Sequence, residues 1–133
     1  MTTVLIVEDD PVNMKVFAKI LTKRGGFEVK GSEDVEEILS LARAGVPDII
    51  LMDVSLSNSY YQGKPVDGIQ ITQMLKSDEK TRSIPVILVT AHAMRGDKEA
   101  FLAESGADGY ISKPVVDHEQ FVATIKAMLS SRG

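Results

Sequence analysis

The sequence predicts an α/β protein built on a doubly wound, five-stranded parallel sheet with helices on both faces. Apolar runs of strand length alternate five times with stretches of helical periodicity, and the connections between them are short. Residues 48–53 hold four consecutive apolar residues that lead into Asp53, a pattern typical of a central strand buried on both faces. Five such units are too few for an eight-stranded barrel, which leaves an open sheet with right-handed crossovers.

The first unit begins at the apolar run of residues 4–7, which ends in an acidic triplet. Asp10 is suited to cap a helix, and Pro11 to occupy its first turn. Gly25 and Gly26 are expected to end this helix. The residues at helical spacing that we expect to face the core are Val12, Val16, Phe17, Ile20 and Leu21.

The second unit is a short strand at residues 27–30 followed by a helix. We expect Ser32 to cap this helix and Gly45 to end it. Acidic residues gather in its first turns, where the helix dipole favours negative charge. Its predicted buried positions are Val35, Ile38, Leu39 and Ala42.

Three further units follow. After an irregular stretch at residues 55–66, a helix is expected at 67–77 and an apolar strand at 84–89. A fourth helix, a short strand at residues 110–111 and a last helix capped by Asp117 complete the pattern.

Composition indicates an ordinary soluble protein, with 44% hydrophobic and 26% charged residues. The absence of cysteine excludes disulfides and thiolate metal sites, and two histidines argue against a histidine-rich zinc centre. A net charge of −4 gives no electrostatic footprint for nucleic acid or an anionic membrane. With no long apolar run and no signal-peptide pattern, we expect a cytoplasmic protein whose residues 1–133 form a single domain without an output domain.

Polar residues follow the strands at one edge of the predicted sheet, namely Glu8, Asp9, Asp53, Thr90 and Lys113. Clustered carboxylates repel one another unless a cation lies among them. Oxygen ligands without histidine or cysteine favour Mg²⁺ over zinc. A lysine and a hydroxyl beside such a site can bind a phosphoryl group, and a carboxylate held there can attack phosphorus.

Five short motifs carry a resemblance to a known family: Glu8–Asp9, Asp53, Thr90–Ala91, Tyr110 and Lys113–Pro114. On these residues the chain resembles, over nearly its whole length, the receiver domain of two-component response regulators. It is most similar to the single-domain members, and residues 90–97 and 110–114 are similar to their cell-division subgroup. The resemblance implies a flavodoxin-like sheet with the strand order 2-1-3-4-5.

The resemblance also implies the chemistry of the site. Asp53 would accept a phosphoryl group from a sensor histidine kinase or a phosphotransfer protein. Mg²⁺ would be held by Asp9 and Asp53 directly, by Glu8 through water and by the backbone carbonyl of Ser55. Lys113 and Thr90, the other two residues of the site, would each contact a phosphoryl oxygen.

A second set of implications concerns signalling. Thr90 and Tyr110 would form the switch that reports phosphorylation to a downstream protein target. Such a module is not an enzyme in the ordinary sense, although it assists its own phosphorylation and dephosphorylation. Ser55 and His92 occupy positions that influence how fast the phosphoryl group is lost.

The chain departs from the family after the phosphoacceptor. Ser57 stands where a proline is usual, and the glycine that should follow is Gly68, which leaves an insertion of about seven residues. The inserted residues are polar and include Tyr60 and Tyr61. A tolerated surface loop and a partner-contacting flap over the site both fit this composition.

Two other functions use a similar sheet. An aspartyl-phosphate phosphohydrolase usually needs a second acid two residues after its nucleophile, and Ser55 occupies that position. A pseudo-receiver would bind partners without phosphorylation, but the acidic, threonine and lysine set is complete. The sequence therefore favours the phosphorylated signalling module.

Overall fold

Five parallel strands form the central sheet of the computed structural model, which describes residues 2–54, 60–90, 97–112 and 117–131. The strands are β1 (Thr3–Val7), β2 (Glu28–Gly31), β3 (Ile49–Asp53), β6 (Val86–Thr90) and β7 (Gly109–Ser112). Their order is β2-β1-β3-β6-β7, with every neighbouring pair parallel. Counted along the sheet strands this is 2-1-3-4-5, so the predicted fold and strand order are confirmed.

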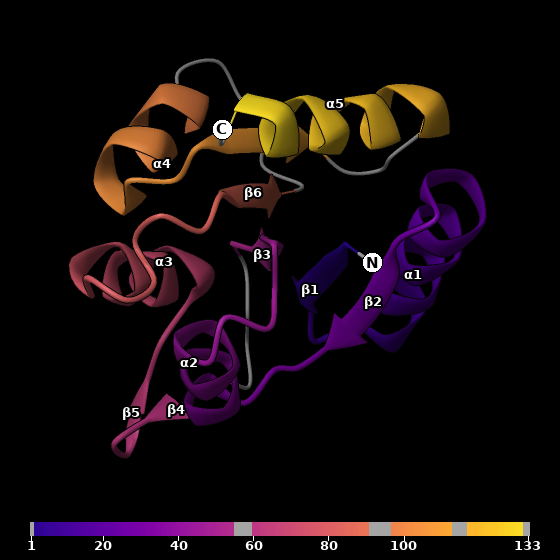
Figure 1. The fold of residues 1–133 in the computed structure, drawn as a ribbon. Coiled ribbons are helices and arrows are strands. Elements are labelled where there is room, and N and C mark those ends of the chain that lie inside the picture. The colour runs from indigo at the N-terminus through magenta and orange to yellow at the C-terminus, as the bar shows by residue number, and fades with distance from the viewer. Residues whose placement is uncertain (1, 55–59, 91–96, 113–116, 132–133) are drawn as a thin grey trace.

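Helices cover both faces of the sheet (Figure 1). One face carries α1 (Pro11–Gly25) and α5 (His118–Ser131), which contact each other. The opposite face carries α2 (Val35–Arg43), α3 (Gly68–Ser77) and α4 (Asp97–Ser105). This division is what a doubly wound sheet requires, because the helices of successive crossovers lie on the side that the right-handed connection gives them.

Alternate strand residues feed two separate hydrophobic cores. In β3, Ile50 and Met52 pack toward α2 and α3, whereas Ile49 and Leu51 pack toward α1 and α5. All residues of β1, β3 and β6 are buried, as expected for the central strands of a parallel sheet. The central strand predicted from its apolar run is therefore confirmed.

The first helix buries a narrower stripe than its sequence pattern predicted. Phe17, Ile20 and Leu21 are buried, but 66% of Val12 and 42% of Val16 are exposed, so the prediction that these two valines face the core is wrong. At about 100° per residue, Val16 and Val12 lie roughly 100° and 140° around the helix axis from Phe17. The contact of Phe17 with α5 determines which side of α1 is buried, and the ring centroids of Phe17 and Phe121 in α5 lie 5.6 Å apart.

The helix caps follow the sequence with one exception. Asp10 caps α1 by accepting a hydrogen bond from the Val12 N–H, and the predicted cap Asp117 accepts one from the Gln120 N–H at the start of α5. A cap that was not predicted is Asp67, which forms a reciprocal capping box with Gln70 in α3. The cap predicted at Ser32 is wrong, because Asp34 caps α2 instead. The Ser32 hydroxyl accepts a hydrogen bond from the Asp34 N–H and so belongs to the turn that precedes the helix.

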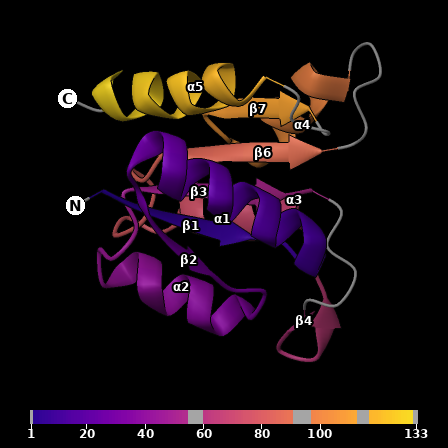
Figure 2. The same cartoon turned by 90° about the vertical axis from the view of Figure 1, so that its right-hand side faces the viewer.

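Part of the stretch predicted to be irregular is a β-hairpin. Its antiparallel strands are β4 (Tyr60–Tyr61) and β5 (Lys64–Pro65). Gln62 and Gly63 between them both have positive φ values, 53° and 80°, as in a type I′ turn. The insertion relative to the family is thus a folded element over these residues, beside α2 (Figure 2).

An ion pair between Lys76 and Asp108 lies at the edge of the sheet opposite to the polar residues, where the Lys76 side chain is half-buried and the Asp108 side chain is exposed. The Lys76 Nζ atom lies 2.7 Å from a carboxylate oxygen of Asp108 and donates to the carbonyls of Arg82 and Ile84. The same Asp108 oxygen accepts a hydrogen bond from the N–H of Val86. Together these bonds join the end of α3 to the starts of β6 and β7.

Candidate functional site

Three acidic side chains meet at the carboxyl edge of the sheet. The register of the parallel pair β1 and β3 aligns Val7 with Met52, so the chain delivers Glu8, Asp9 and Asp53 to one place. Each of these acids offers a carboxylate oxygen that lies within 4.8 Å of the oxygens of the other two. Glu8 and Asp53 are buried and Asp9 is half-buried, which lowers the solvent screening of their charges. The predicted acidic constellation is therefore present.

The flanking elements hold these acids in place. Glu8 and Asp9 lie between the end of β1 and the N-terminus of α1, and a Glu8 carboxylate oxygen accepts a hydrogen bond of 3.4 Å from the Asp10 N–H. Asp53 is the last residue of the buried strand β3. Strand and helix geometry thus restrict all three side chains, as a preformed ligand set requires.

Helix α3 begins directly against Asp53. The Gly68 N–H donates a hydrogen bond of 3.3 Å to the carbonyl of Val54. A Cβ atom added at Gly68 would overlap the backbone carbonyl oxygen of Asp53 and lie 3.0 Å from the Met52 side chain. Only glycine allows this approach, which gives a physical reason for the glycine that the sequence places after the insertion.

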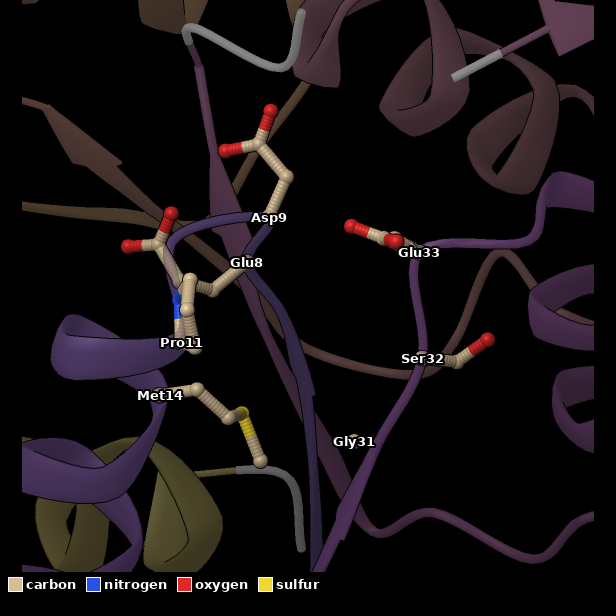
Figure 3. A pocket seen from close by; sticks show the side chains of 7 residues that line it. All are labelled: Glu8, Asp9, Pro11, Met14, Gly31, Ser32 and Glu33. Carbon is tan, nitrogen blue, oxygen red and sulfur yellow. The ribbon is translucent and has the colours of Figure 1, made fainter. Parts of the chain in front are cut away.

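A pocket of about 630 Å³ opens beside the acids. Figure 3 shows Asp9 and Glu33 on opposite sides of it, with Met14 extending from α1 toward Gly31. A Cβ atom at Gly31 would clash with the Met14 side chain, so the absence of a side chain there makes room for this wall. The acid-rich start of α2 is a weak sequence signal for this pocket. The lining residues are Glu8, Asp9, Pro11, Met14, Gly31, Ser32 and Glu33.

Thr90 and Tyr110 lie on the same face of the sheet. Thr90 is fully buried at the end of β6, two residues after Leu88, whose side chain belongs to the core under α2 and α3. Tyr110 pairs with Leu88 across β6 and β7 and is half-buried against that core. The structure thus places both residues on the face of the sheet that packs under α2 and α3.

The other predicted site residues are Ser55, His92 and Lys113, and all three lie outside the described residues. Among the described groups, the acids and Thr90 are thus the chemically useful residues that the strand ends bring to this edge. No helix within the described residues is long and apolar enough to cross a membrane.

Comparisons with known proteins agree on one family. The profile of the response regulator receiver domain matches residues 4–126. The polar-differentiation response regulator DivK of Brucella ovis is 42% identical over 127 residues, which cover 96% of this chain and 95% of the relative. DivK of Brucella anthropi is equally similar, with 42% identity and the same coverage.

Solved structures give the same result. The receiver domain of a sensor histidine kinase from Pseudomonas aeruginosa, with a magnesium ion coordinated in its active-site cleft, has a TM-score of 0.80 and 29% identity. The alignment covers 97% of this chain and 98% of that one. The receiver domain of a histidine kinase from Syntrophus aciditrophicus has a TM-score of 0.80 and 27% identity, with coverage of 98% and 92%.

Proposed function

The chain belongs to the response regulator receiver domain family, and we propose that it is a signalling protein switched by phosphorylation of Asp53. The observation that carries this proposal is the acidic cluster, in which Asp53 ends the central strand with its carboxylate within 4.8 Å of those of Glu8 and Asp9. Two neighbouring acids at that distance are costly unless the site binds a cation. The phosphoryl donor would be a sensor histidine kinase or a phosphotransfer protein.

The donor set fits Mg²⁺. Carboxylate oxygens without nitrogen or sulfur ligands suit a hard cation, and a similar receiver domain holds magnesium in its cleft. In this chain Asp9 and Asp53 would bind the ion directly, Glu8 through water, and Ser55 through its backbone carbonyl. When bound, Mg²⁺ would offset the negative charge that accumulates as a phosphoryl group approaches the carboxylates.

Phosphoryl transfer requires an ionised, positioned carboxylate. A carboxylate oxygen of Asp53 donates an electron pair to phosphorus, and the P–O bond forms as the P–N bond of the phosphohistidine breaks. The bonding pair of the P–N bond returns to the imidazole nitrogen, which later takes a proton from solvent. Lys113 and the hydroxyl of Thr90 would bind two of the transferred oxygens, and attack by water on the acyl phosphate would regenerate Asp53 and release inorganic phosphate.

Readout of the phosphoryl group would depend on the Thr90–Tyr110 face. A phosphoryl group adds roughly two negative charges and several strong acceptors at one point. Rotation of the buried Thr90 hydroxyl toward that charge would vacate space near Tyr110, whose half-buried ring can move into it. The surface formed by α4, β7 and the start of α5 would then change, and a downstream protein would bind there.

Intact-mass spectrometry tests the proposal. Incubation with acetyl phosphate and Mg²⁺ should add one phosphoryl unit to the wild-type protein, and chelation of the metal should prevent the gain. Asp53→Asn should abolish labelling, whereas Asp10→Asn should retain it because asparagine caps a helix as well as aspartate. Full labelling of the Asp53→Asn variant would show that another residue is the acceptor.

A further inference from the structure

The inserted hairpin presents one tyrosine to solvent and anchors the other. Neighbouring residues of a strand point to opposite sides. Tyr61 is half-buried against the core under α2 and α3, whereas Tyr60 is 60% exposed. The type I′ turn at Gln62 and Gly63 matches the twist of the paired strands. The ring of Tyr60 is therefore held on a folded support.

Both ends of the insertion are fixed next to the phosphoacceptor. Val54, directly after Asp53, is buried in the same core that Tyr61 contacts, and Val66 after the hairpin packs there too. The Gly68 N–H then bonds the carbonyl of Val54. The hairpin thus projects from the carboxyl edge of the sheet, the edge that carries the acidic cluster (Figure 2).

Exposed acids lie beside the hairpin. Strand β4 contacts α2, and Figures 1 and 2 both place it near the N-terminal end of that helix. Asp34, Glu36 and Glu37 are exposed there. Across the parts of the chain that the structure describes, Glu36 and Glu37 form no ion pair. The face therefore combines one exposed aromatic ring with unpaired negative charge.

We propose that Tyr60 and the acids at the start of α2 form a docking surface for the phosphodonor protein. This inference rests on the proposed function, because the donor must bring its phosphohistidine to the carboxyl edge. A standard interface covers about 800 Å² on each partner, roughly a ninth of the 7234 Å² surface of this chain. Because the hairpin projects from the edge that carries the acidic cluster, a donor protein that approaches Asp53 also approaches the hairpin (Figure 2).

The chemistry of the surface defines the partner. Tyrosine is enriched among the residues that dominate binding energy, where its ring fills an apolar pocket. The acids favour basic side chains on the opposite face, and such charges mainly speed association and select partners. The donor should therefore carry an apolar pocket for Tyr60, flanked by lysine or arginine facing Glu36 and Glu37.

Phosphotransfer profiling tests this surface. Two kinds of phosphodonor are compared. The first is acetyl phosphate, and the second is the phosphorylated catalytic core of whichever sensor histidine kinase of the source organism transfers fastest to the wild-type protein. Tyr60→Ala should slow transfer from that kinase by at least about tenfold, equivalent to about 1.4 kcal/mol. Labelling by acetyl phosphate should stay within about twofold, because the small donor needs no docking surface. Tyr60→Phe should retain most of the kinase transfer.

Charge reversal supplies the second arm. Glu37→Lys should slow kinase transfer several-fold and weaken its dependence on salt concentration. Glu28→Lys is the matched control, since it makes the same charge change at an exposed position of β2 and should leave transfer unchanged. The melting temperatures of the Tyr60, Glu37 and Glu28 variants should equal that of the wild-type protein, because all three side chains are exposed. Equal melting temperatures would exclude a folding defect as the cause of slower transfer.

The outcomes separate the two proposals. Unchanged kinase transfer in Tyr60→Ala, with normal acetyl phosphate labelling of all variants, would overturn the docking surface and leave phosphorylation of Asp53 intact. Equal losses with both donors would also overturn it, because the ring would then support the site itself. Failure of acetyl phosphate to label the wild-type protein would instead contradict the proposed function, and the docking surface with it.

Discussion

Neutralising one acid of the cluster should stabilise the metal-free protein. At the 4.8 Å limit that separates the carboxylate oxygens, each pair of charges repels by about 1 kcal/mol in bulk water and by roughly 3.5 kcal/mol at an effective dielectric constant of 20. Asp9 is half-buried and has two such neighbours, Glu8 and Asp53, so solvent still screens part of the repulsion. We therefore expect Asp9→Asn to raise the free energy of unfolding by about 1–3 kcal/mol without metal.

The same substitution should remove the benefit of Mg²⁺. A ligand that binds only the folded state at 100 times its dissociation constant adds about 2.7 kcal/mol of stability. Wild-type protein should gain this increment, whereas Asp9→Asn, which lacks a proposed direct ligand, should gain little. Asp9→Asn should therefore be the more stable protein without Mg²⁺, and the wild-type protein should become the more stable one as the Mg²⁺ concentration rises.

Urea unfolding with EDTA and with Mg²⁺ measures both effects. Asp34→Asn is the matched control, because it makes the same chemical change at an exposed helix cap outside the cluster. The reasoning is refuted if Asp9→Asn is less stable than wild type in EDTA and gains as much stability from Mg²⁺. In that case the three acids would neither destabilise the metal-free protein by mutual repulsion nor bind Mg²⁺ through Asp9.

Three further predictions concern stability and one concerns signalling. Gly68→Ala should lower the free energy of unfolding by about 3 kcal/mol, because its new methyl group meets rigid backbone. Gly109→Ala should lower it by under about 1 kcal/mol, because its methyl group meets the flexible end of Met128. Similar losses for the two variants in urea unfolding would contradict this reasoning. Lys76→Met should cost about 1 kcal/mol by leaving the half-buried carbonyl of Ile84 without its donor, and an unchanged melting temperature would exclude that role. The Arg43 guanidinium holds the pKa of Asp78 below its ordinary value of 3.8, so the stability that this ion pair adds should be present above that pH and be lost as the pH falls through the lowered pKa. Asp78→Asn should abolish this part of the dependence of unfolding free energy on pH. Wild-type and Asp78→Asn profiles that stay parallel from pH 6 to pH 3 would count against it. Thr90→Ala should still accept phosphate but shrink the NMR shifts around the half-buried Tyr110, and full-sized shifts would argue against the switch.

Local sequence patterns predicted the elements that carry the chemistry. The apolar run before Asp53 and the acids after residue 7 identify strand ends without any tertiary information. Parallel strands bring those ends to one edge, so the acidic cluster follows from the alternation of strands and helices. The strand order came from family resemblance rather than from these patterns.

Features that depend on tertiary packing could not be predicted from local sequence patterns. Val12 and Val16 satisfy helical periodicity, but the contact of Phe17 with α5 determines which side of α1 is buried. The tie between Lys76 and Asp108 spans 32 residues and has no local pattern. The hairpin had only a weak signal at Gln62–Gly63, because Asn-Gly or Asp-Gly is the strong form of that turn.

The most direct test of the account is the chemical identity of the phosphorylated residue. Borohydride reduces an aspartyl phosphate to homoserine, and peptide sequencing by mass spectrometry then locates the changed residue. After treatment with acetyl phosphate and Mg²⁺, we predict homoserine at position 53 alone, at the buried end of β3. Homoserine at position 9 or 10, or phosphate that resists borohydride on a serine, threonine or histidine, would contradict the assignment of Asp53 as the phosphoacceptor.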